Sequence, residues 1–106
     1  MNTIKAAALA ATGLLLGACG SSGINCDNST TKSCTVATWP GVMSPSPVCT
    51  NGATSVGSCA GGAVNTCSYT DSKSFPSTVT YTVNFYSGAD IAAAMAFCTS
   101  VSGTFK

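Results

Sequence analysis

The sequence predicts a small, disulfide-rich α+β domain, in which antiparallel strands are packed by one C-terminal helix. Three observations lead to this class. The chain has 106 residues and seven cysteines, so it holds one small domain at most. Apolar and polar residues alternate over about 78–86, which predicts a strand. An alanine-rich run over about 89–101 favours a helix.

The charged residues are few, and their types exclude several functions. The chain has no His, no Arg and no Glu, and its net charge is +1. Without His, the usual acid–base group at neutral pH is missing. Without Arg, bidentate binding of phosphates is unavailable, and a near-zero charge gives no basic surface for nucleic acid. We therefore expect no catalytic activity and no nucleic-acid partner.

Residues 1–18 are predicted to form a signal peptide. Met1–Lys5 is weakly cationic, and Ala6–Leu16 is an apolar run. Extended to Ala18 as a helix, the run spans roughly 20 Å, whereas the hydrocarbon core of a bilayer needs about 30 Å. The run is therefore typical of an export signal rather than of a membrane-spanning helix.

The residues that close this run, Leu16-Gly17-Ala18-Cys19, resemble the lipobox of bacterial lipoproteins. The resemblance implies cleavage before Cys19, a diacylglyceryl group on its thiol and an acyl group on its new amino terminus. Membrane lipid is then the partner of Cys19, and no other cofactor is expected. Gly20 lacks the Asp that retains many such proteins in the inner membrane, which favours the outer membrane. Residues 19–23 would form a lipidated tether, and residues 24–106 a single domain.

Six cysteines remain in the predicted domain, and they are expected to compensate for a thin core without Leu. Export would place them in an oxidising compartment, where they form three disulfides. No CxxC motif and no His occur, so no metal site is predicted. The sequence does not fix the connectivity; pairing of near neighbours predicts Cys26–Cys34, Cys49–Cys59 and Cys67–Cys98.

The elements of the C-terminal half follow from local patterns. Residues 63–70 are compatible with a strand, and 71–77 with a loop that contains Pro76. In the strand at 78–86, the side chains predicted to face the core are Val79, Tyr81, Val83 and Phe85. The N-terminal half, to about residue 62, shows little periodicity and is predicted to be loop-rich.

The helix at 89–101 is predicted to begin with a capping box of Ser87 and Asp90. Gly103 is expected to terminate it, and Cys98 faces the sheet. The apolar stripe of this helix consists of Ile91, Ala94, Met95, Cys98 and Val101.

The C-terminal half also resembles small cysteine-rich bacterial lipoproteins of uncharacterised function. The resemblance covers about residues 49–106. It is carried by Gly57–Cys59, Cys67–Tyr69, Phe85–Ser87 and an alanine-rich helix that contains Cys98 and is followed by Ser102–Phe105. It implies the scaffold and the exported location, and no functional residue.

Three short motifs suggest chemistry, but each is better explained by a polar loop. Ser29-Thr30-Thr31-Lys32 matches the SxxK pattern of serine acyl-transfer enzymes, without their other motifs. Asp71-Ser72-Lys73 groups an acid, a hydroxyl and an amine without a fixed frame. Asn28-Ser29-Thr30 fits a glycosylation acceptor.

The leading interpretation is a non-catalytic structural or interaction module that contacts an envelope protein. Trp39 and Met43, in a proline-bounded loop, are its candidate partner contacts, although Trp39 equally fits a core position. One alternative is an inhibitor or toxin-like effector presenting residues 39–47. Another is a small-ligand or glycan binder using Trp39, Tyr69, Tyr81 or Tyr86, which requires a concave site of about 300 Å³ or more.

Overall fold

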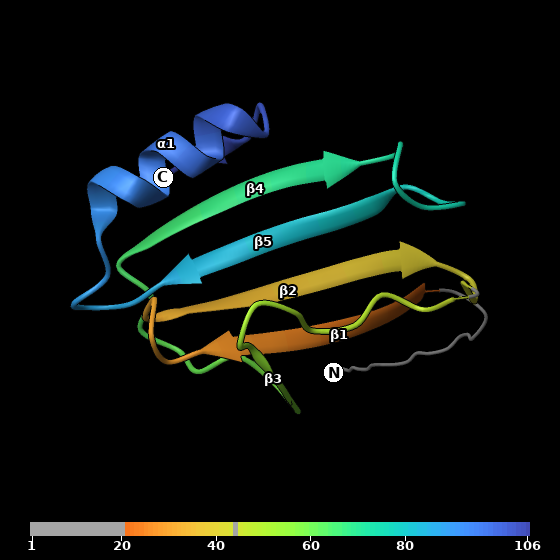
Figure 1. The fold of residues 1–106 in the computed structure, drawn as a ribbon, viewed down its shortest axis with the longest axis horizontal. Helices are drawn as coiled ribbons and strands as arrows, with labels where there is room; N and C mark the ends of the chain where they lie inside the picture. The colour runs from red at the N-terminus through yellow and green to blue at the C-terminus, as the bar shows by residue number, and fades with distance from the viewer. Residues whose placement is uncertain (1–20, 44) are drawn as a thin grey trace, which may run out of the picture.

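The computed structural model describes residues 21–43 and 45–106. The described chain forms one antiparallel six-stranded sheet, in the order β3-β1-β2-β5-β4-β6, and a helix beside it (Figure 1). The predicted disulfide-rich α+β class is confirmed. The predicted signal peptide (1–18) and the predicted lipidation site Cys19 lie outside the described residues. The elements are β1 Ser21–Asn28, β2 Ser33–Pro40, β3 Thr54–Val56, β4 Asn65–Asp71, β5 Val79–Phe85, α1 Ile91–Ser100 and β6 Thr104–Phe105.

β5 lies between β2 and β4, and its alternation confirms the prediction from the sequence. Val79, Val83 and Phe85 are buried, and Tyr81 is half-buried on the same face. β4 forms a seven-residue ladder with β5, close to the predicted strand at 63–70.

The prediction of a loop-rich N-terminal half is wrong for β1 and β2, which form a regular eight-residue hairpin. The turn residues explain its position: the Asn28 carboxamide oxygen accepts the N–H groups of Thr30 (3.0 Å) and Thr31 (3.2 Å). Lys32 then takes a left-handed conformation, with φ of 55°. β1 begins at Ser21, within the range expected to be a tether, and pairs there with Pro40.

The predicted capping box of Ser87 and Asp90 is wrong, because Asp90 is itself the N-cap of α1, which begins at Ile91. The Asp90 carboxylate accepts the N–H of Ala93 at 3.1 Å. Of the predicted stripe, Ala94 and Cys98 are buried, whereas Met95 is 52% exposed. The prediction for Met95 is wrong because α1 packs on the sheet through the narrower line of Ala94 and Cys98.

Gly103 takes part in ending α1 as expected, because its N–H donates to the Cys98 carbonyl oxygen at 2.8 Å, but it has a second role. The left-handed residue after the helix is Ser102, with φ of 56°. A Cβ at Gly103 would lie 2.8 Å from the Cys98 Sγ and 2.9 Å from the Cys67 Sγ. Gly103 is therefore required by the close passage of the chain over the disulfide.

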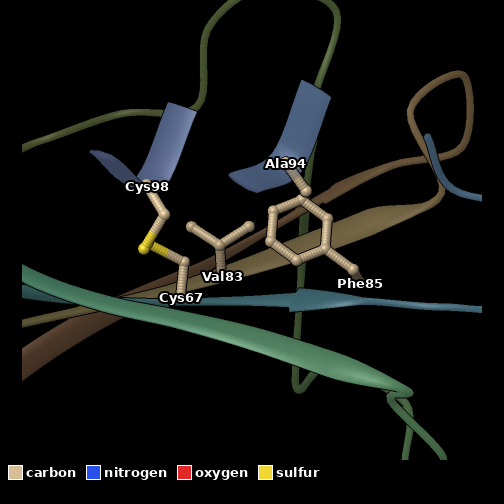
Figure 2. Close-up of a cluster of buried hydrophobic side chains, with 5 residues drawn as sticks. All are labelled: Cys67, Val83, Phe85, Ala94 and Cys98. Carbon is tan, nitrogen blue, oxygen red and sulfur yellow. A yellow bond between two sulfur atoms is a disulfide. The ribbon is translucent and has the colours of Figure 1, made fainter. Parts of the chain in front are cut away.

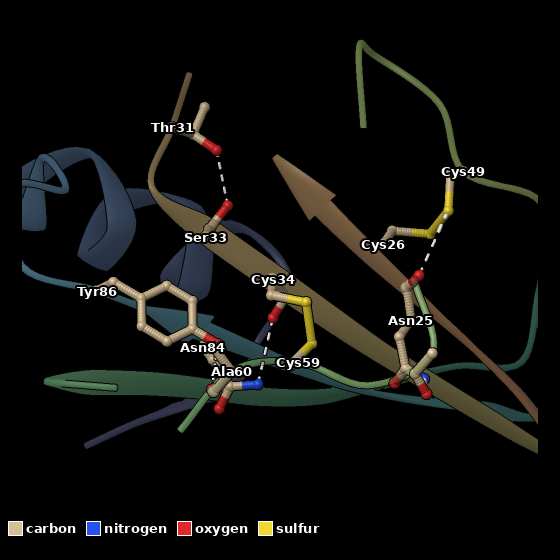
Figure 3. Close-up of a disulfide and its surroundings, with 11 residues drawn as sticks. Asn25, Cys26, Thr31, Ser33, Cys34, Cys49, Cys59, Ala60, Asn84 and Tyr86 are labelled. Atoms are coloured by element: carbon tan, nitrogen blue, oxygen red, sulfur yellow. Dashed lines mark hydrogen bonds between the residues drawn. A yellow bond between two sulfur atoms is a disulfide. The ribbon is translucent and has the colours of Figure 1, made fainter. Parts of the chain in front are cut away.

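Two of the three predicted disulfide pairings are wrong. Cys67–Cys98 is confirmed and ties α1 to β4 inside a buried cluster (Figure 2). The others are Cys26–Cys49 and Cys34–Cys59, both starting from the hairpin (Figure 3). The hairpin register pairs Cys26 with Thr35, one position from Cys34. Since neighbouring residues of a strand point to opposite faces, Cys26 and Cys34 cannot bridge.

A second buried cluster lies under the start of the loop that follows β2. Its members are Ala37, Trp39, Met43 and Val79, and Ile24, Phe75 and Tyr81 pack against it. Trp39 and Met43 are therefore core residues in this structure, being 5% and 3% exposed.

Candidate functional site

Both sheet faces carry chain from the connections, and one face also carries α1. We call the latter the helix face, because Cys98 of α1 reaches Cys67 there. Directly paired residues share a face, so the register defines the surface. Two rows cross the four long strands on the helix face: Ile24, Ala37, Tyr81 and Tyr69, and then Cys26, Thr35, Val83 and Cys67.

A groove runs over this face between α1 and the connection from β2 to β3. In Figure 1, α1 lies along β4, and the connection passes over the β1–β2 part of the sheet. The Cys26–Cys49 bridge holds the connection to β1. The groove has a volume of about 920 Å³. This exceeds the roughly 300 Å³ that a small-molecule site needs.

The groove has a floor and two walls of different composition. The floor is the sheet and includes Thr35, Ala37 and Val83. One wall is α1, through its small residues Ala93 and Ala94 and the larger Phe97. The opposite wall is the connection, whose lining residues are Pro45, Ser46, Pro47, Val48, Cys49, Thr50, Asn51 and Ala53.

Five aromatic residues line the groove, and three of them pack against one another. The Tyr69 and Tyr81 rings stack with centroids 4.7 Å apart and planes 13° from parallel. Phe97 of α1 meets Tyr69 edge-on at 5.6 Å. Phe75, from the β4–β5 connection, and Phe85, at the end of β5, also line the groove. Burial raises the pKa of Tyr69, with Tyr81 and Asp71 adding to the effect, and burial followed by Asp71 raises the pKa of Tyr81.

The lining is close to electrically neutral. Among the described residues that line the groove, Asp90 is the one acidic residue, and none is Lys or Arg. Its carboxylate already accepts the Ala93 N–H at the start of α1. The remaining polar groups are hydroxyls and the side-chain amides of Asn28 and Asn51. The Asn28 oxygen holds the hairpin turn, and its amide nitrogen donates to the Asn51 carbonyl oxygen.

The four aromatic residues that the sequence suggested as ligand contacts have different roles in the structure. Tyr69 and Tyr81 line the groove. Tyr86 donates its hydroxyl proton to the Ala60 carbonyl oxygen at 2.7 Å, and so fixes a loop. Trp39 is buried, and within the described part of the chain its Nε1 has no hydrogen-bond partner.

Sequence reasoning missed the groove residues Phe75, Phe97 and Ala93. No periodic pattern in the sequence indicates that the connection from β2 to β3 forms a wall of the groove. The Cys26–Cys49 disulfide places it there, and the sequence does not fix that pairing. The T-shaped contact of Phe97 depends equally on the placement of α1 over β4.

The three motifs with possible chemistry lie in turns. Ser29 and Lys32 are exposed in the β1–β2 turn and do not lie on a helix. The Asp71 carboxylate accepts the N–H groups of Lys73 (2.9 Å) and Ser74 (3.2 Å), which lowers its pKa. Within residues 21–43 and 45–106, no three side chains form a metal-binding group. Nor does any helix of that part have the length and apolarity to cross a membrane.

Comparison with known protein families, curated proteins and solved structures finds no match to this chain.

Proposed function

We propose that this protein is an exported, lipid-anchored binding module of the bacterial envelope, without catalytic activity. The observation that carries the binding role is the groove on the helix face, with its volume of about 920 Å³. The lipobox-like residues ending at Cys19 support the anchor. Three disulfides support an exported location, because such bonds persist in oxidising compartments.

The chemistry of the groove supports binding over catalysis. The chain has no His, and the one carboxylate at the groove, Asp90, is engaged in capping α1. General acid–base catalysis needs a titratable group free to exchange a proton with a substrate. The walls are suited to contact with a neutral molecule, through Ala93, Val48 and the aromatic residues.

The anchor is tested by cell fractionation of a Cys19→Ala variant. We expect wild-type protein in the membrane fraction and the variant outside it, because the thiol that accepts the lipid is lost. A Gly20→Ala variant keeps the thiol and serves as the control. Retention of Cys19→Ala in the membrane fraction would contradict the anchor.

The binding role is tested with a photoreactive residue, p-benzoylphenylalanine, in the full chain in its own envelope. Ala93 and Ala96 are both exposed on α1, but only Ala93 lines the groove. We expect irradiation to give a covalent adduct from position 93 and not from position 96. An equal adduct yield at the two positions would contradict a role for the groove.

One observation favours a second candidate function, an inhibitor or toxin-like effector. Val42 is 92% exposed, while Trp39 and Met43 on either side of it are buried. A loop held by two buried side chains presents its tip as a rigid contact. If this function holds, Val42→Asp abolishes binding to a target hydrolase while leaving adduct formation at Ala93 unchanged.

A further inference from the structure

We propose that the groove on the helix face binds one acyl chain of a membrane lipid, with the lipid headgroup left outside. The inference deepens the proposed function and rests on it, because the predicted anchor holds the domain at the membrane surface. Its own support comes from the charge, shape and walls of the groove.

The charge of the lining favours an apolar, uncharged occupant. None of the described groove residues is Lys, and the chain has no Arg. The side chain of Lys32 lies beside Gly88 but is exposed and does not line the groove. Asp90, which caps α1, is itself a carboxylate and so does not attract a carboxylate or a phosphate. An anionic headgroup therefore finds no cationic partner inside the groove, whereas a hydrocarbon chain needs none.

The floor favours a hydrocarbon chain over a glycan or a peptide. Ala37 and Val83 are buried in the paired rows of the sheet, and the half-buried Tyr81 lies in the row with Ala37. Thr35, paired with Val83, is the one Ser or Thr in these two rows. Sugar hydroxyls and peptide groups lose their hydrogen bonds to water when they are buried, and apolar side chains do not replace those bonds. β2 and β5, which carry Thr35, Ala37 and Val83, are paired on both sides, so a peptide cannot add to them as a further strand.

The sides of the groove combine small residues with a group of aromatic rings. Ala93 and Ala94 are small, which leaves room between α1 and the connection opposite. Tyr69, Tyr81 and Phe97 pack together on one side of this space. Aromatic rings and aliphatic side chains present large apolar surfaces to a hydrocarbon chain.

The test identifies the photo-adducts by mass spectrometry of the full-length protein in its own envelope. Two matched pairs of positions are used, so that the result does not depend on one substitution. Ala93 is paired with Ala96 on α1. Val48, 71% exposed on the opposite wall, is paired with Val42, 92% exposed and outside the groove. Absence of free thiol in each variant shows that its disulfides have formed.

We expect the peptides that contain positions 93 and 48 to gain the mass of a separate lipid, at least tenfold more often than their controls. Hydrolysis of the lipid esters then leaves a fatty acyl chain on the peptide. A protein, peptide or glycan adduct at these positions would overturn the acyl-chain inference while leaving the binding module intact. So would a cross-link to the anchor of Cys19 itself. No excess of adducts over both controls would overturn the inference and the binding role together.

Discussion

At the scale of single residues, Gly103 shows how the absence of a side chain permits close packing. A Cβ at this position would meet both sulfurs of Cys67–Cys98 and the Ser68 carbonyl oxygen at 2.8–2.9 Å. None of these atoms is the free end of a flexible side chain. We expect Gly103→Ala to lower the free energy of unfolding by about 1–3 kcal/mol, as overpacking does.

Urea unfolding of the oxidised protein measures this loss. Gly61→Ala is the control, since a Cβ at Gly61 would have no atom within 4 Å and its φ is not positive. Such a replacement at a compatible site changes stability by less than about 1 kcal/mol, and usually raises it. Equal stability of the two variants would mean that the chain does not pass tightly over the disulfide.

We expect the free energy of unfolding to fall at alkaline pH because of Tyr69 and Tyr81. Burial raises the pKa of both phenols in the folded chain. In the unfolded chain a tyrosine titrates near pKa 10. The folded protein therefore keeps these protons to higher pH, so the stabilisation is complete below the unfolded pKa and is lost as pH rises through the folded pKa.

Unfolding free energies measured between about pH 8 and 11 check this prediction. We expect the decline above the unfolded pKa to be shallower in a Tyr69→Phe/Tyr81→Phe variant, which keeps the stacked rings. The same decline in variant and wild type would show that the phenols do not contribute.

At the scale of elements, the strands that the sequence predicts are those that bury side chains on one face of the sheet only. β5 buries Val79, Val83 and Phe85 on one face, which produces alternation. β2 instead buries Cys34 on one face and Ala37 and Trp39 on the other, so its pattern is not periodic. β1 has Ile24 as its one β-branched residue. It is ordered by its pairing with β2 and β3 and by a disulfide, none of which is visible in local sequence.

The start of α1 gives a prediction for this element. Asp90→Ala removes the acceptor of the Ala93 N–H. We expect a loss of about 0.5–2 kcal/mol, the usual cost of an N-cap, and faster amide hydrogen exchange in the first turn. Asp90→Asn keeps an acceptor oxygen and should retain most of the stability. Equal exchange rates in Asp90→Ala and wild type would contradict the cap.

At the scale of the whole molecule, two disulfides of similar span act on opposite faces. Cys26–Cys49 closes over 23 residues and Cys34–Cys59 over 25. On the chain-entropy model, each stabilises the fold by about 3.5 kcal/mol. Only Cys26–Cys49 lies beside the groove, where it holds the wall that contains Val48.

Removing each bridge separately distinguishes stability from site geometry. We expect Cys26→Ala/Cys49→Ala and Cys34→Ala/Cys59→Ala to lose similar unfolding free energy by urea titration. Photo-adduct formation at Ala93 should fall several-fold in the first variant and remain in the second. A comparable fall in both would mean that adduct formation follows overall stability.

The candidate site is less predictable than the fold because it exists only after the chain is assembled. The residue types of Tyr69 and Tyr81 suggest ligand contacts, but their stacking depends on the β4–β5 register. By residue type, Trp39 and Met43 fit an exposed partner contact as well as a core position. In the folded chain they are buried in the cluster with Ala37 and Val79.

The two hairpin disulfides also determine how the domain carries a mechanical load. A pull on the N-terminal end of β1 can peel only Ser21 to Asn25 from β2 before tension reaches Cys26. From there a covalent path runs through Cys49, around the sheet edge past β3, and through Cys59 into Cys34 of β2. The tension therefore passes through covalent bonds and does not load the hydrogen bonds of the rest of β1. A domain attached to a membrane by that end, as proposed, is therefore tension-resistant at its point of attachment.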